Sequence, residues 1–77
     1  MDKRLKHLNN LRSFESAARH QSYSKAAEEL FVTQAAVSQQ MRQLETSLGT
    51  RLFARSGRKM QLTNSGEKLY QATHQAF

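Results

Sequence analysis

Apolar residues recur at helical spacing along the first third of the chain. The first stripe, which ends at the polar segment of residues 20–22, consists of Leu8, Leu11, Phe14, Ala17 and Ala18. A second, short helix is predicted to begin near Ser24, a plausible N-cap, and to bury Ala26, Ala27 and Leu30. The larger apolar side chains that we assign to the core are Phe14, Phe31, Leu44 and Phe53.

A third helix is predicted after Thr33, which is a good N-cap residue. Its apolar positions follow at spacings of four, three and four: Val37, Met41, Leu44 and Leu48. Gly49 stands where a glycine commonly ends a helix in the left-handed region. Because only about three residues separate the second and third helices, the pair is typical of a helix-turn-helix unit.

The pattern then changes to two short β-like runs at residues 52–54 and 60–62, around a loop that contains Gly57. Thr63 is predicted to cap a final helix. The sequence therefore predicts a mainly α fold, a winged helix-turn-helix with three helices, a two-stranded wing hairpin and a C-terminal linker helix. We expect this winged domain at residues 1–62 and the start of a further helix at residues 63–77.

Charge and composition narrow the possible partners and sites. Twelve Lys and Arg against six Asp and Glu give a formal net charge of +6, which favours a polyanionic partner. The chain has no cysteine, its three histidines are scattered, and no nucleophile is paired with a base. We therefore expect no metal site and no cofactor, and we expect that the chain is not an enzyme. Apolar runs fall far short of the roughly 20 residues that span a bilayer, and no signal peptide is recognisable, so we expect a soluble cytoplasmic protein with no membrane partner.

The outer face of the third helix is unusual because it is polar but almost uncharged. It carries Gln34, Ala35, Ser38, Gln39 and Arg42, and no carboxylate occurs from residue 34 to residue 43. Gln can pair with adenine, Ser can hydrogen-bond to base edges, and Ala can contact a thymine methyl group. The face therefore suits the major groove of DNA, with the helix leaving the groove near Glu45.

Three stretches of the chain resemble the N-terminal domain of the LysR-type transcriptional regulators: "SYSKAAEELFVTQAAVSQQMRQLE", "LGTRLFAR" and "LTNSGEKL". The likeness covers about residues 8–77. The pieces "FESAARH" and "ELFVTQAAVSQQ" most resemble the branch with the glycine-cleavage activator and the β-lactamase regulator. The resemblance implies sequence-specific binding of double-stranded operator DNA, with a recognition helix at about residues 34–48 in the major groove and a wing at about residues 55–59 in the minor groove.

The resemblance also assigns individual residues. Base contacts are expected from Gln34, Ala35, Ser38, Gln39 and the wing residue Arg58. Backbone contacts are expected from Ser24, Lys25, Thr33, Arg42 and Arg55. Lys59 departs from the family pattern, which often has a small residue or proline there, and is expected to add a further phosphate contact. A homodimer is expected to form through the last helix, with the stripe Leu69, Tyr70, Thr73 and Phe77, and to read an interrupted palindrome.

The remaining expectations concern the whole protein and the alternatives. The stripe of the last helix stops in mid-pattern at Phe77, so we expect a longer protein. The resemblance implies that an effector domain follows, that the longer protein can assemble further into a tetramer, and that it is associated with the nucleoid. Two other functions remain open on the residues alone, the binding of structured RNA and the docking of a protein partner on the third helix or the wing.

Overall fold

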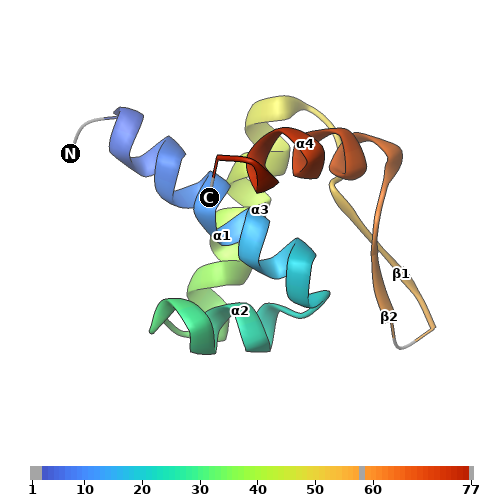
Figure 1. The fold of residues 1–77 in the computed structure, drawn as a ribbon, viewed down its shortest axis with the longest axis horizontal. Helices are drawn as coiled ribbons and strands as arrows, with labels where there is room; N and C mark the ends of the chain where they lie inside the picture. The colour runs from blue at the N-terminus through green and yellow to red at the C-terminus, as the bar shows by residue number, and fades with distance from the viewer. Residues whose placement is uncertain (1–2, 58, 77) are drawn as a thin grey trace.

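The structure, a computed structural model, describes residues 3–57 and 59–76, with side chains from residue 7 onward. The element order is α1 (Lys3–His20), α2 (Tyr23–Leu30), α3 (Gln34–Leu48), β1 (Phe53–Ser56), β2 (Lys59–Leu62) and α4 (Asn64–His74). In Figure 1, α1 and α3 cross at the centre, α2 lies at one end, α4 lies across the other, and the hairpin projects to the side. The predicted winged helix-turn-helix fold is confirmed.

The core lies where α1, α2 and α3 meet the start of the hairpin. Its largest fully buried side chains include Phe14 of α1, Met41 and Leu44 of α3, and Leu52 just before β1. The Phe14 and Phe53 rings lie 5.5 Å apart, which links α1 to the hairpin. Small residues on α2, Ala26 and Ala27, are buried and permit the close helix approach that a helix-turn-helix needs.

The second helix begins earlier than the sequence suggested, because Ser22 and not Ser24 is its N-cap. Ser22 is extended, at φ −162° and ψ 126°, and its hydroxyl accepts a hydrogen bond from the Lys25 N–H at 3.1 Å. Ser24 lies within the first turn of α2 and is exposed. The prediction missed this start because the preceding residue, Gln21, turns the chain with a positive φ of 52°.

Three predicted core residues are less buried than expected. Phe31 is 94% exposed because it ends α2 in the left-handed conformation, at φ 58°, and this turn directs its side chain away from the core. Leu30 is half-buried. Leu48, in the last turn of α3, is 47% exposed, since Leu52 and Phe53 fill the core at that end.

Glu45 connects the recognition helix to the wing. Its carboxylate accepts hydrogen bonds from the backbone N–H groups of Leu52, at 2.7 Å, and Phe53, at 3.4 Å. Arg51 lies 3.8 Å from the same oxygen. The only acidic residue in the second half of α3 therefore binds within the domain, which fixes where the hairpin leaves the helix.

The hairpin and the last helix follow the predicted turn and cap chemistry. β1 and β2 pair antiparallel, with Phe53 opposite Leu62. Thr63 caps α4 by accepting a hydrogen bond from the Gly66 N–H at 3.0 Å. A Cβ at Gly66 would lie 2.2 Å from the Leu52 carbonyl oxygen, so only glycine lets α4 approach the start of the hairpin this closely.

The stripe of α4 is packed, in part, against its own domain. Leu69 and Tyr70 are half-buried against the core, and the Thr73 side chain is buried with its hydroxyl bonded to the Leu69 carbonyl at 2.9 Å. Phe77 lies outside the described residues. The dimerisation role of this stripe, and the division of the chain at residue 62, stay predictions.

A charged cluster joins α1, α2 and α4, and in it His74 of α4 lies 3.3 Å from the Glu15 carboxylate. Arg19 bonds to the carboxylates of Glu15 and Glu29, and His20 lies 2.9 Å from Glu29. The Arg19 guanidinium lowers the pKa of Glu29 from 4.5 to about 2, with smaller contributions from His20 and Ser16. Glu29 thus pairs with basic groups within the fold.

This pairing predicts a dependence of stability on pH. Because folding lowers the pKa of Glu29, its contribution is present above pH 4.5 and disappears as the pH falls towards 2. We expect Glu29→Gln to be less stable than the wild type at neutral pH and to approach it below pH 4.5, in urea unfolding followed by circular dichroism. A difference that stays constant from pH 7 to pH 2 would contradict the ion-pair role.

Candidate nucleic-acid interface

The third helix presents its outer face because its inner face is buried against α1, α2 and the start of the hairpin. Val37, Met41 and Leu44 are buried. The glutamines that neighbour them are used inside the domain: Gln40 accepts a hydrogen bond from the Ser13 hydroxyl, and the Asn10 amide donates to Gln43 at 3.4 Å. These bonds fix the rotation of α3 about its axis, and so decide which side chains face outward.

The outward face is the one that the sequence predicted. Gln34, Ala35, Gln39 and Arg42 are exposed, and Ser38 is half-buried. The helix begins cleanly, because the Thr33 hydroxyl accepts a hydrogen bond from the Ala36 N–H at 3.1 Å. An exposed stretch with two amides, two small residues and a cation therefore extends along the first half of α3.

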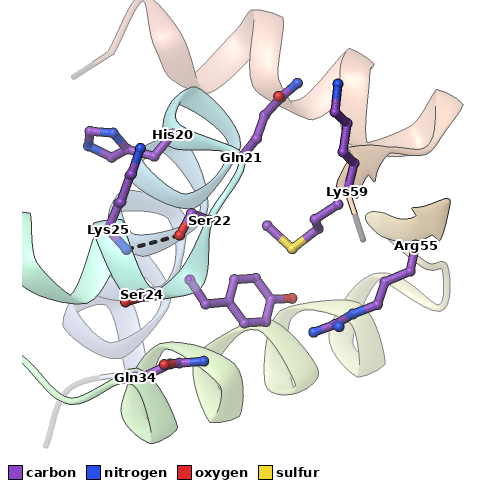
Figure 2. Close-up of a pocket in the computed structure, with 10 residues that line it drawn as sticks. His20, Gln21, Ser22, Ser24, Lys25, Gln34, Arg55 and Lys59 are labelled. Atoms are coloured by element: carbon purple, nitrogen blue, oxygen red, sulfur yellow. Dashed lines mark hydrogen bonds between the residues drawn. The ribbon is translucent and has the colours of Figure 1, made fainter. Parts of the chain in front are cut away.

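A hollow of about 360 Å³ lies between the start of α2, the start of α3 and the wing. Five of the predicted contact residues line it: Ser24, Lys25, Gln34, Arg55 and Lys59. Figure 2 shows Arg55 and Lys59 of the wing on one side, His20 and Lys25 on the opposite side, and Gln34 below. Predicted contact residues that are 35 positions apart in the chain, Ser24 and Lys59, thus share one surface.

The hollow is electrostatically suited to an anion. Lys25, Arg55 and Lys59 contribute cationic groups, and no carboxylate is among the described residues that line it. The acidic side chains nearby, Glu29 and Glu45, are already paired with basic or N–H groups of the fold. A polyanion therefore meets attraction without a facing negative charge.

Some predicted contacts do not join this hollow. Arg42 lies farther along α3, next to Gln39 and Gln43 in a shallower depression. Thr33 is exposed, but its hydroxyl serves as the helix cap. Arg58, the predicted minor-groove residue, lies outside the described residues. The individual roles of all these side chains stay predictions.

Five residues that the sequence reasoning did not assign to the interface also line the hollow: His20, Gln21, Ser22, Tyr23 and Met60. The polar segment at residues 20–22 was interpreted only as the end of a helix. The structure shows that the exposed Gln21 in this segment turns the chain with a positive φ. The closeness of this segment to the wing depends on tertiary packing. Tyr23 gave no signal, because a lone aromatic at the start of a helix is usually assigned to a core.

Among the described residues, no group of three or more potential metal ligands comes together. No helix in this part of the chain is long and apolar enough to span a bilayer.

Comparison with known proteins adds independent evidence on the family. Residues 8–67 match the family described as "Bacterial regulatory helix-turn-helix protein, lysR family". The glycine cleavage system transcriptional activator of Escherichia coli K12 is 56% identical over 70 residues, which cover 91% of this chain and 23% of that protein. The transcriptional regulator TrpI of Pseudomonas aeruginosa is 53% identical over 77 residues, 100% of this chain and 26% of that protein.

A solved structure agrees with the fold. The BenM DNA-binding domain in complex with catB site 1 DNA superposes with a TM-score of 0.84 at 35% identity, over 90% of this chain and 77% of that chain. The chain spans about a quarter of the length of the two curated relatives above. Those relatives are regulators of transcription, which confirms the prediction that the chain is not an enzyme. The chain belongs to the LysR family of bacterial regulatory helix-turn-helix proteins.

Proposed function

We propose that this chain is the DNA-reading part of a transcriptional regulator and binds double-stranded operator DNA in a sequence-specific way. The observation that carries the proposal is the joining of two surfaces. The exposed, nearly uncharged face of α3 continues into a basic hollow that the wing completes. A polar face without carboxylates can approach base edges, while the basic hollow can hold the sugar-phosphate backbone.

In this proposal the first half of α3 enters the major groove. Gln34 and Ser38 hydrogen-bond to base edges, with Ala35 and Gln39 beside them, and Arg58 reaches the adjacent minor groove. Ser24, Lys25, Arg55 and Lys59 hold the backbone around the hollow, and Thr33 and Arg42 contact it on either side. Support comes from the arrangement of these residues and from the related domain solved on its DNA site.

We infer that the protein acts as a homodimer through α4, with a tetramer as a further assembly of the longer protein. Two copies of α3 related by a two-fold axis would read the halves of an interrupted palindrome. The half-site spacing would then be set by the geometry of the dimer. Such a regulator would work with the nucleoid in the cytoplasm.

The experiment that tests the proposal is selection of bound duplexes from a randomised DNA pool at near-physiological salt. We expect an interrupted inverted repeat with an A·T-rich centre, which binds far more tightly than a scrambled duplex. Salt-sensitive binding with no enriched sequence would contradict the proposal. Preference for a structured RNA over every duplex would favour an RNA-binding winged helix instead.

A second expected result concerns Arg42, whose exposed guanidinium is proposed to contact a phosphate. Arg42→Ala should weaken binding to the selected and the scrambled duplex alike, because phosphates carry no sequence information. The slope of log K against log salt concentration should become shallower by about one unit. Fluorescence anisotropy titrations at several salt concentrations would check this, and a loss confined to the selected duplex would instead indicate a base contact.

A further inference from the structure

We propose that the hollow between α2, α3 and the wing binds one phosphate group of the DNA backbone, and that the hydroxyl of Tyr23 donates a hydrogen bond to it. The inference rests on the proposed function and deepens it. It adds Tyr23, which neither the sequence nor the family resemblance assigned, to the predicted backbone contacts that line the hollow, and it says where one strand of the duplex crosses the domain.

The first argument is the composition of the hollow. Three cationic side chains, Lys25, Arg55 and Lys59, line it from α2 and from both strands of the wing. The amides of Gln21 and Gln34 add neutral hydrogen-bonding groups. Its volume of about 360 Å³ is many times the roughly 30 Å³ that one water molecule occupies, so a hydrated phosphodiester fits.

The second argument is the fixed position of Tyr23. It is the first residue of α2 and is half-buried, and its ring meets the Phe53 ring edge-on, with centroids 5.6 Å apart and an interplanar angle of 86°. This contact holds the phenol at the junction of α2 and the wing. The ring is thus placed by the core, and only its polar end remains for another partner.

The third argument is that this polar end is available to a ligand. The Tyr23 hydroxyl makes no hydrogen bond to another described residue. Every fully enclosed side-chain polar atom in the described part of the chain has a hydrogen-bond partner, so the Tyr23 oxygen is not one of the enclosed atoms. The oxygen is therefore open to solvent on the side of the hollow. A hydroxyl at such a place exchanges water for an anionic oxygen without leaving a buried group unpaired.

The fourth argument is the protonation state of the phenol. Burial raises the pKa of Tyr23 above its ordinary value of 10, and Glu45 adds to this effect, while Arg55, Arg51 and Arg42 oppose it. The phenol therefore keeps its proton at neutral pH and acts as a donor. Of these arginines, Arg55 also lines the hollow beside Tyr23, and its positive charge favours an anionic acceptor there.

The experiment compares the wild type with Tyr23→Phe on the selected duplex and on duplexes in which single phosphates are replaced, one at a time, by neutral methylphosphonates. Phenylalanine keeps the contact with Phe53 and removes only the oxygen. We expect the variant to bind about 10-fold more weakly to the selected and the scrambled duplex alike, as for a lost hydrogen bond to a charged group. At one phosphate position, the methylphosphonate should weaken the wild type but add little to the loss in the variant.

A second measurement needs no substitution of the protein and so remains decisive if the variant is unstable. The ring carbon that bears the Tyr23 hydroxyl should change its ¹³C chemical shift when the selected duplex is added, and much less with the methylphosphonate duplex at that position. If the wild type selects a sequence but Tyr23→Phe binds equally well, or the shift does not change, the inference is wrong and the proposed function stands. If the wild type selects no sequence, both fail.

Discussion

Replacing Leu44 by alanine should lower the free energy of unfolding by about 2–5 kcal/mol, the usual cost of a cavity at a fully buried leucine. Leu44 is 1% exposed and lies in the middle of the core with Phe14 and Met41. A domain of this size has a total stability of only about 4–12 kcal/mol. Thermal and urea unfolding, followed by circular dichroism, should therefore show a much lower midpoint or a largely unfolded chain.

Leu48→Ala is the matched control on the same helix. Both leucines fit the helical pattern equally well, but Leu48 is 47% exposed. Its replacement should cost less than about 1 kcal/mol, because a half-exposed side chain leaves no closed cavity. Equal losses from the two variants would mean that the orientation of α3 is wrong, and with it the identity of the outward face.

Replacing Gln34 by alanine should cost about 1–3 kcal/mol in binding to the selected duplex, with little change on scrambled DNA. The reason is that Gln34 is exposed at the first position of α3, where a recognition helix meets base edges. The preference for one base pair in each half-site should relax at the same time. Anisotropy titrations against duplexes with all four base pairs at each half-site position would measure this.

Gln71→Ala provides the control for this experiment. It removes the same amide from an exposed position on α4 that does not line the hollow, and should leave both affinities unchanged. An equal loss for Gln34→Ala on selected and scrambled DNA would assign Gln34 to the backbone. No loss of affinity on either duplex would mean that Gln34 is not part of the interface.

The largest differences between expectation and structure lie at the two ends of α2, the N-cap at Ser22 and the left-handed turn at Phe31. Thr33, Gly49 and Thr63 carry local signals that depend on a residue and its nearest neighbours, and the structure confirms all three as helix ends. Ser24 carried the same kind of signal and was wrong, since Ser22 caps α2. Phe31 was wrong because hydrophobicity says nothing about backbone conformation, and a left-handed residue directs its side chain outward.

The sequence by itself determined the elements of this protein, their order, and the outward face of the recognition helix. Helical spacing, cap residues and the loop glycine act over a few residues, so they are readable without a fold. Gln34, Ala35, Gln39 and Arg42 could be assigned for that reason, and the structure places all four at the surface.

The tertiary structure alone decided which distant residues share the hollow. Lys25, Tyr23 and Lys59 come together because the core packs α2 against the hairpin and because Glu45 holds the start of the hairpin at 2.7 Å from its carboxylate. Contacts between residues so far apart depend on how buried surfaces fit in three dimensions, and no local pattern encodes that fit. The same packing left Phe31 outside the core and placed Tyr23 at the hollow.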